Sequence, residues 1–274
     1  MPARLLGLPF LLLFVWSIYA AWGAEDDWFA YPVLVSAILV ALVYVFSPEI
    51  NWWFYRRWTP RLDPPVKHLL GQFGGYYNSL SEAERVIFEQ RLFLTVTATD
   101  FLAQGLPSVP EDIRYMIAYP QVCLNFRQEE WLCKRSEKTV LYPHPFPSPA
   151  HPEQLHYSEW YAEDGVLIYV LPWVVEGFTR PGAVYNVVFH EQAKVFRDCR
   201  PDLALPETAE AGIWEKLEAI SGMSREYIAK IVGLPQEDPY PISVHHFFLY
   251  PEAFQRELPA RYASYLRLFG GKND

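Results

Sequence analysis

The segment Asn186-Val187-Val188-Phe189-His190-Glu191-Gln192-Ala193-Lys194 carries most of the information about the fold. It follows the pattern His-Glu-x-x-His up to the last position. In that pattern two histidines one helical turn apart face one metal ion, and the glutamate beside the first acts as a general base. His190 and Glu191 are present, whereas the last position is Lys194, a cation at neutral pH and a poor metal ligand. The segment therefore predicts a metal-site helix that has lost one ligand.

Two apolar runs stand at the start of the chain. Leu5 to Trp22 and Phe29 to Phe46 contain no charged residue, and each run has 18 residues. As helices they would be about 27 Å long, close to the thickness of the hydrocarbon core of a bilayer. Between the two runs lie residues 24–27, which are too few for anything but a hairpin turn. We expect residues 1–58 to form a membrane anchor of two transmembrane helices.

The positive charges predict the orientation of this anchor. Arg4 precedes the first run, the turn has no basic residue, and four basic residues follow the second run: Arg56, Arg57, Arg61 and Lys67. The positive-inside rule then places both the N-terminus and the C-terminal part in the cytoplasm, at the inner membrane. The basic residues after the second run would contact anionic lipid headgroups. Two alternatives remain open: a signal peptide cleaved before Ala24, and a hairpin buried in a protein core.

The net charge and the cysteine content indicate which partners and which cellular compartment to expect. The net charge is −9 at pH 7, and no basic stripe exists beyond the arginines next to the second run. Nucleic acid is therefore not expected as a partner. The three cysteines, Cys123, Cys133 and Cys199, have no metal-type spacing. An odd, sparse count is typical of a reducing compartment, so we expect buried, reduced thiols.

The remaining sequence predicts one α+β domain. Residues 59–65 contain three prolines and form a stiff linker, so the domain spans residues 66–274. Ser81-Glu82-Ala83-Glu84 is a capping box that begins an amphipathic helix. A strand is expected over residues 139–142. Further helices are expected over residues 111–119, 184–195, 210–232 with a break at Gly222, and 250–269 with an interruption at Pro259.

The strongest strand signal precedes the metal-type helix. It consists of Val166, Leu167, Ile168, Tyr169, Val170 and Leu171. Pro172 follows, and because proline cannot donate to a strand ladder, we expect this strand at the edge of a sheet. An edge strand beside a site helix can bind an extended peptide by backbone pairing. The alternative is an ordinary structural strand.

Three further histidines lie in or just after a proline-rich loop over residues 143–152. They are His144, His151 and His156, and their spacing matches no usual set of metal ligands. We expect them to be surface histidines.

Five segments of the domain, taken in order, resemble the zinc metallopeptidases of the Mlc titration factor A type. They are the helix start at residues 81–85, Tyr142-Pro143-His144-Pro145-Phe146, Asp164-Gly165 with the following strand, residues 186–191, and Phe247-Phe248-Leu249-Tyr250-Pro251-Glu252. The resemblance extends from about Leu80 to Phe269. It implies a zincin-like fold, to which this chain adds a membrane hairpin.

The resemblance also implies roles for single residues. His190 falls on the first zinc ligand, Glu191 on the catalytic base and Lys194 on the second ligand. His245 falls on the third ligand, where the family has glutamate, and His246 beside it is an accessory candidate. A catalytic zinc ion needs three protein ligands. Zinc is therefore a cofactor that the resemblance implies and that Lys194 opposes.

A lysine at the second ligand position has a specific consequence. We expect its ammonium to take the place of the metal and to pair with Glu191, three residues earlier on the same helix face. The residues alone also allow simpler roles: a buried core histidine at position 190, a solvated lysine at position 194, and a surface pair for His245 and His246.

Together these features favour a membrane-anchored, non-catalytic protein derived from a peptidase, which binds or regulates a peptide or protein partner. One alternative is an active zinc-dependent metallopeptidase with His190 and His245 as ligands and Glu191 as the base. Another is a structural membrane protein in which the hairpin carries the function.

Overall fold

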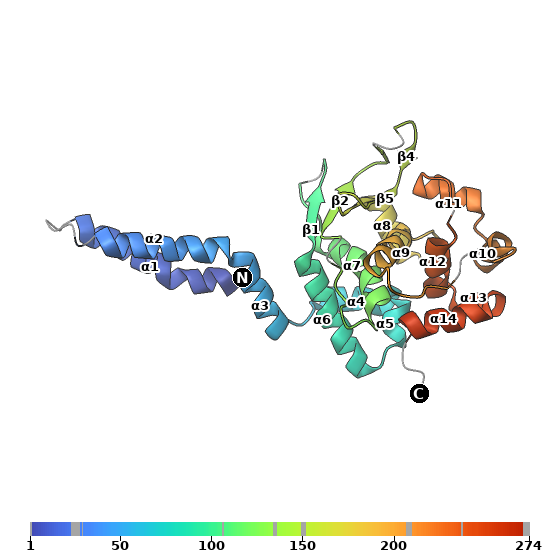
Figure 1. Ribbon diagram of the computed structural model, residues 1–274, viewed down its shortest axis with the longest axis horizontal. Coiled ribbons are helices and arrows are strands. Elements are labelled where there is room, and N and C mark those ends of the chain that lie inside the picture. Colours follow the sequence, from blue (N-terminus) through green and yellow to red (C-terminus); the bar gives the residue numbers. More distant parts are fainter. Residues whose placement is uncertain are drawn as a thin grey trace. The chain divides into compact units, whose positions relative to one another are not determined.

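The computed structural model describes residues 2–22, 28, 30–105, 107–133, 136–148, 152–206, 210–236 and 238–270. The chain forms two compact units, Met1–Pro60 and Arg61–Asp274 (Figure 1). The predicted turn at residues 24–27 and the predicted surface histidine His151 lie outside the described residues.

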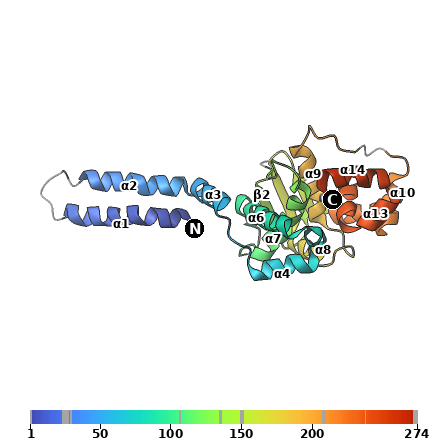
Figure 2. The same ribbon diagram turned by 90° about the horizontal axis from the view of Figure 1, so that it is seen from below.

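The first unit consists of three helices, α1 (Pro2–Trp22), α2 (Ala30–Val45) and α3 (Ser47–Arg57). The first two lie side by side (Figure 2). Small residues allow this approach, because a Cβ atom added at Gly7 would meet Val43 at 3.2 Å. The buried hydroxyls of Ser17 and Ser36 bond to carbonyls one turn earlier in their own helices. Close packing through small residues is typical of helices in a membrane.

Among the described residues, α1 is the single helix that is long and apolar enough to cross a membrane by itself, and an N-terminal signal sequence has the same properties. The prediction of two separate transmembrane helices is not confirmed, because the second apolar run does not form one helix long enough to span a bilayer. The second apolar run ends as the 16-residue α2, which is too short by itself. It passes only together with α3, from which it is bent by 60°. Pro48 at the start of α3 lacks a backbone donor, which favours a new helix start at this point.

The second unit is an α+β domain, as predicted, with a small mixed sheet. Its four strands are β1 (Asp100–Ala103), β2 (Lys138–Tyr142), β5 (Ser158–Tyr161) and β6 (Val166–Val170). They are arranged in the order β1-β2-β6-β5, in which β5 alone is antiparallel to its neighbour. A short hairpin of β3 (Phe146–Pro147) and β4 (Leu155–His156) is separate from this sheet.

The prediction that the strand before Pro172 lies at a sheet edge is wrong. This strand is β6, which is paired with β2 on one side and with β5 on the other. Leu171 is not part of it but begins helix α8. Pro172 is tolerated because it occupies the first turn of α8, where its missing N–H costs no hydrogen bond.

The described part of the second unit also contains eleven helices. They are α4 (Pro64–Phe73), α5 (Gly75–Ser79), α6 (Glu82–Ala98), α7 (Glu111–Asn125), α8 (Leu171–Thr179), α9 (Val187–Cys199), α10 (Ile213–Ser221), α11 (Arg225–Val232), α12 (Tyr240–Leu249), α13 (Pro251–Glu257) and α14 (Pro259–Phe269). The predicted capping box is present, because Ser81 and Glu84 bond to each other's backbone N–H. The predicted break at Gly222 is also confirmed, since this residue ends α10 with φ of 72°.

Helix α9 contains the metal-type segment and lies inside the domain. It contacts α7, α8, α12 and β5 (Figure 1). Every residue from Val187 to Ala193 is buried. Any side chain in this part of the helix must therefore find its partners within the protein.

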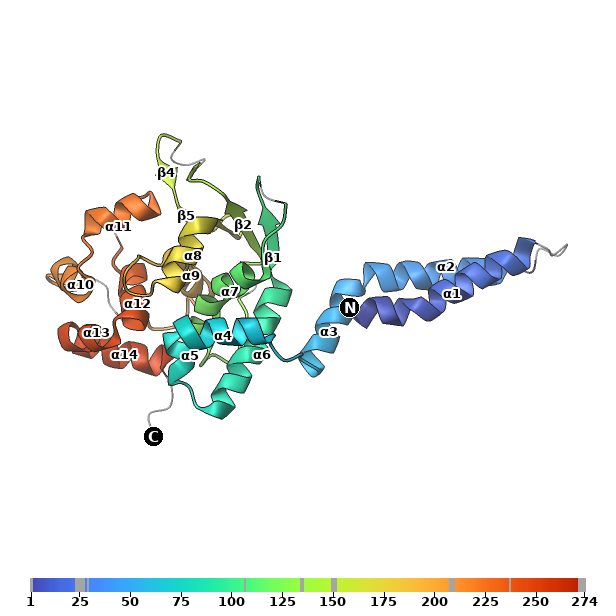
Figure 3. The same cartoon turned by 180° about the vertical axis from the view of Figure 1, so that it is seen from behind.

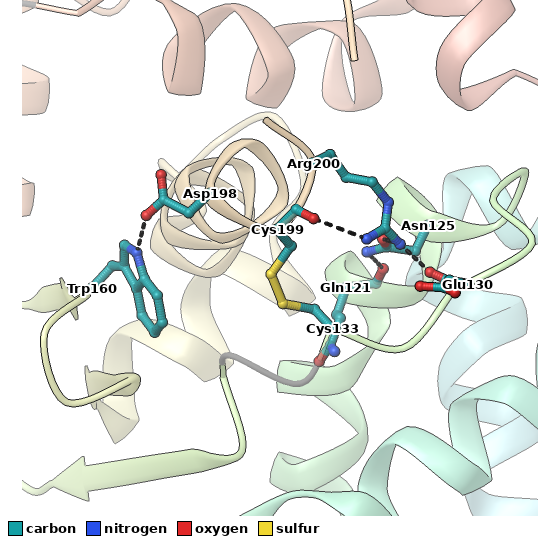
Figure 4. The surroundings of a disulfide bond; sticks show 8 residues. All are labelled: Gln121, Asn125, Glu130, Cys133, Trp160, Asp198, Cys199 and Arg200. Carbon is teal, nitrogen blue, oxygen red and sulfur yellow. Dashed lines mark hydrogen bonds between the residues drawn. A yellow bond between two sulfur atoms is a disulfide. The ribbon is translucent and has the colours of Figure 1, made fainter. Parts of the chain in front are cut away.

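The expectation of three reduced cysteines is wrong for two of them. Cys133 and Cys199 form a disulfide bond with a Cα–Cα distance of 6.1 Å, whereas Cys123 is free and buried (Figure 4). The bond joins the last turn of α9 to the segment that follows α7. Next to it, the Arg200 guanidinium donates to the Asn125 side chain. The two cysteines are 66 residues apart, so the sequence alone gave no signal of their contact.

The expectation of surface histidines holds for His144 but is wrong for His156. His144 is exposed, whereas His156 is fully buried in β4 and stacks on Phe146. Gly233 packs so closely against this strand that an added Cβ atom would lie 2.7 Å from the Cα atom of His156. Its φ of 89° is also in the region that favours glycine.

Candidate functional site

Asn186 fixes the start of the site helix. Its side-chain oxygen accepts hydrogen bonds from the backbone N–H groups of Val188 (3.0 Å) and Phe189 (3.2 Å), which is an N-cap. Its amide nitrogen donates to the carbonyl of Gly177 at 2.9 Å. A side chain at Gly177 would lie 3.0 Å from Asn186, so a glycine permits this contact between α8 and α9. The cap places the next residues, His190 and Glu191, in the first turns of the helix.

The Glu191 carboxylate is fully enclosed by the protein. One oxygen accepts a hydrogen bond from the Ser158 hydroxyl at 2.8 Å. The other oxygen lies 2.9 Å from the Lys194 ammonium, which forms the ion pair that the sequence predicted. Glu191 has no exposed side-chain surface and Lys194 is 24% exposed. A fully buried carboxylate needs such a partner, because burying an unpaired charge is very costly.

His190 makes a contact that the sequence did not predict. Its Nδ1 atom lies 2.6 Å from the Tyr185 hydroxyl, and both side chains are buried. Among the described residues no hydrogen-bond partner faces its Nε2 atom, which is also buried. This nitrogen is therefore the one potential ligand atom of His190 that the protein does not use.

His245 and His246 form a hydrogen-bonded chain instead of a surface pair. Both are fully buried. The backbone N–H of Asn186 donates to Nε2 of His245 at 3.0 Å, so the proton of this imidazole is on Nδ1. That Nδ1 lies 3.0 Å from Nδ1 of His246 and donates to it. The Tyr185 ring stacks on His245, with ring centroids 4.2 Å apart, and meets His190 edge-on at 5.7 Å.

Burial keeps these three histidines neutral. We call His190, His245 and His246 the histidine cluster. Burial, the Lys194 charge and His245 hold the pKa of His190 well below its usual range. Burial and His246 do the same to the pKa of His245. Burial lowers the pKa of His246 to about 3, although the Leu217 carbonyl partly opposes this effect. Neutral imidazole is the form that binds metals and also the form that accepts hydrogen bonds.

The arrangement does not fit a zinc site with three protein ligands. Within the described ranges, no group of three or more His, Cys, Asp or Glu side chains is placed to hold a metal ion. Both ring nitrogens of His245 are in hydrogen bonds, and the Tyr185 ring lies against both His190 and His245. Lys194 occupies the second ligand position and is paired with the predicted base. Among the candidate ligand nitrogens in the part of the chain described, Nε2 of His190 and Nε2 of His246 have no hydrogen-bond partner.

The strand next to the site helix is β5. Its first residue, Ser158, donates to Glu191 in the first half of α9. The indole N–H of Trp160 donates to Asp198 near the C-terminal end of the same helix, at 2.7 Å (Figure 4). Strand β5 is the last strand of the four-stranded sheet. Val170 donates to the Tyr157 carbonyl, which makes these two residues a hydrogen-bonded pair.

This pairing determines which backbone groups of β5 point away from the sheet. Hydrogen-bonded and non-hydrogen-bonded pairs alternate along an antiparallel ladder. In the observed register, Glu159 and Tyr161 therefore bond to β6. Ser158 and Trp160 direct their backbone N–H and C=O groups away from β6, and of these two residues Ser158 is fully buried whereas Trp160 is partly exposed. An extended chain could pair with the backbone groups of Trp160.

The structure thus brings together most of the predicted site residues. Glu191, Lys194, His190 and His245 share one buried region, and His246 joins it through His245. The predicted peptide-binding strand does not offer an edge. Tyr185 and Ser158 were missed, because Tyr185 precedes the helix and Ser158 comes from a strand with no alternating apolar pattern.

No protein-family model matches this chain, and no curated protein matches it closely. The resemblance to Mlc titration factor A-type peptidases therefore rests on the segments and spacings of the sequence.

Proposed function

We propose that the domain is a peptidase-derived binding domain that does not cleave peptides, and that a membrane anchor precedes it. The observation that carries this proposal is the buried ion pair of Lys194 with Glu191. A general base must reach a water molecule or substrate group at hydrogen-bond distance. One oxygen of Glu191 instead accepts a hydrogen bond from Ser158, and the other is in an ion pair with Lys194. The zincin-like fold of the domain is part of the same proposal.

The open edge of β5 is where the partner would bind. An extended peptide or a protein segment adds as a further strand beside Trp160, and its backbone supplies the hydrogen bonds. Strand β5 is held in place by its contacts with Glu191 and Asp198 of α9. The pseudoenzyme would thereby keep the peptide groove of a peptidase while its catalytic atoms have become structural.

One observation favours the alternative of an active zinc enzyme. The Nε2 atom of His190 is buried without a hydrogen-bond partner among the described residues. An imidazole nitrogen in such a place is a candidate metal ligand. The alternative also needs His245 to leave its bond to the Asn186 N–H, and Lys194 to leave Glu191.

Metal content and peptide cleavage test the proposal. The full chain is purified in lipid nanodiscs without chelator, and bound zinc is measured by mass spectrometry. We expect no stoichiometric zinc and no cleavage of fluorescein-labelled casein. Lys194→His should raise zinc affinity, since it removes the cation and restores the two-histidine helical pair. One equivalent of zinc in the wild type that is lost in His190→Ala, together with cleavage, would establish the enzyme instead.

Peptide capture at β5 is tested with the same labelled casein. Trp160→Pro removes the backbone N–H at the open edge and should abolish capture. Trp160→Phe is the matched control, because it also loses the indole bond to Asp198 but keeps the backbone donor. Equal capture by both variants would mean that the partner does not pair with this edge.

The two-pass arrangement with both ends in the cytoplasm belongs to the proposal as well. The positive charges that flank the apolar runs support it. The Cys133–Cys199 bond opposes it, because disulfides are rare in cytosolic proteins. A phosphatase reporter that is active only outside the cytoplasm, fused after the last residue, decides between them. Reporter activity would refute the cytoplasmic orientation and leave the binding function of the domain untouched.

A further inference from the structure

A cavity is lined in part by Phe189 of α9, and its volume is about 590 Å³. Further lining residues come from α5, α8, α12 and α14, whose places in the domain Figure 3 shows. Small-molecule pockets in proteins typically have volumes of roughly 300–1,000 Å³. The cavity is therefore large enough for a ligand.

Aromatic rings form a large part of the wall. They include Tyr76, Tyr119, Phe178, Phe189, Phe247 and Phe248. Four of these, Tyr119, Phe178, Phe189 and Phe247, are buried. Phe189 and Phe248 stack with centroids 5.0 Å apart, which gives the wall a flat, rigid surface. Aromatic faces bind other rings in offset or edge-on contact.

Several polar side chains of the wall are already bonded within the protein. Tyr76 donates to the Phe269 carbonyl at 2.6 Å, Asn78 to the Gly71 carbonyl at 2.9 Å, and Asn186 to the Gly177 carbonyl. Among the described residues that line the cavity, none has a charged side chain. A charged ligand would lose its hydration there without finding a counter-charge.

We propose that this cavity binds a neutral, ring-containing apolar small molecule. The ring-rich wall supplies contact area, and the absence of charged lining residues in the described chain excludes anionic and cationic ligands of the same size. Asn186 lies in the wall and also holds His245, so the site borders the histidine cluster without including it. The proposal is independent of whether the domain binds or cleaves peptides.

Gly75 offers a way to close the cavity. It lines the cavity, it is exposed, and a Cβ atom added there would meet no atom within 4 Å. A tryptophan at this position therefore has room for its first atoms and would place its ring at the mouth. Gly71, in the preceding helix α4, is also exposed and equally open, but it does not line the cavity. It provides a matched control.

The test uses benzophenone as the probe, because it is neutral, has two rings and forms covalent bonds to nearby C–H groups on illumination. The full chain in lipid nanodiscs is labelled, and the labelled residues are located by mass spectrometry. We expect saturable labelling of the lining helices α12 and α14 in the wild type and in Gly71→Trp, and its loss in Gly75→Trp. Labelling of the apolar helix α1 reports probe dissolved in lipid and should be equal in all three proteins.

A competition experiment on the wild type needs no variant. Excess biphenyl, which is neutral, should suppress the labelling of α12 and α14, whereas biphenyl-4-sulfonate should not. The proposal is overturned if labelling is confined to α1, if Gly75→Trp labels as strongly as Gly71→Trp, or if the sulfonate competes as well as biphenyl.

Discussion

Removing the charge of Lys194 should show how much this charge contributes to the free energy of unfolding of the domain. In Lys194→Met the Glu191 carboxylate keeps the hydrogen bond from Ser158 but loses the ammonium at 2.9 Å. Removing one partner of a buried ion pair typically costs about 3–5 kcal/mol. Because Lys194 is 24% exposed, water can partly replace the ammonium, and we expect the lower end of that range, about 3 kcal/mol.

A double-mutant cycle separates the ion pair from other effects of the substitution. Glu191→Gln keeps an acceptor for Ser158 and leaves a lysine that can reach water, so it should cost only about 1 kcal/mol. The double variant should cost clearly less than the sum of the two single variants, with a coupling energy of about 2 kcal/mol. The control is Arg180→Met, whose i,i+4 pair with Glu176 is about half exposed and should contribute at most about 0.5 kcal/mol.

Urea unfolding of the chain in nanodiscs, followed by tryptophan fluorescence, gives these free energies. The argument would be refuted if Lys194→Met were no less stable than Arg180→Met. It would also be refuted if the double variant lost the sum of the two single effects, because Lys194 and Glu191 would then act independently.

Two further predictions concern stability. The pKa values of the histidine cluster are lowered in the folded state, whereas an unfolded chain binds protons below its ordinary pKa of about 6.5. The free energy of unfolding should therefore fall by up to about 4 kcal/mol between pH 7.5 and pH 5.5, about 1.4 kcal/mol for each histidine, as measured by urea unfolding at each pH. In a His246→Phe variant the free energy of unfolding should depend less steeply on pH. An unchanged pH dependence would contradict the assignment. Reduction of the Cys133–Cys199 bond should cost up to about 4 kcal/mol, the loop-closure entropy of a 66-residue loop, as seen in urea unfolding with and without dithiothreitol. The reductant should have no effect on a variant with serine at both positions, and a loss of stability there would assign the effect elsewhere.

The parts of the fold that could be predicted are those with local causes. The capping box at Ser81, the left-handed end of α10 at Gly222 and the new helix after Pro259 each depend on residues within one or two turns. The extent of α7 was underestimated, since it continues through Pro120 to Asn125. Burial of its last two turns against the domain core overrides the local preference to end at the proline.

The strand order could not be predicted, because it depends on which distant segments pair. Strand β6 has the most apolar sequence because it is central, and Pro172 misleadingly suggested an edge. The real edge strand, β5, begins with Ser158 and Glu159, which have low strand propensity. Their place in the sheet follows from pairing with β6 and from contacts with α9.

The sequence predicted most residues of the candidate site but not the hydrogen bonds and ring contacts between them. The spacing of Glu191 and Lys194 on one helix was enough to predict their ion pair. The Tyr185 ring against His245 and the Asn186 N–H on its Nε2 atom join segments that are about 60 residues apart in the chain. No local pattern reports such contacts.

If the domain does not cleave peptides, as we propose, Lys194 accounts for the presence of a buried Glu191. A metal ion in a zincin-type site supplies the positive charge that makes a buried glutamate tolerable. Without such a charge, Glu191 would be an unpaired carboxylate with no exposed surface, which is among the most destabilising features that a core can contain. The Lys194 ammonium supplies a positive charge at 2.9 Å, and the same substitution removes a ligand. A lysine at this position would thus remove a metal ligand and at the same time supply the positive charge that keeps the buried Glu191 stable. The presence of Glu191 is therefore by itself no argument for catalysis.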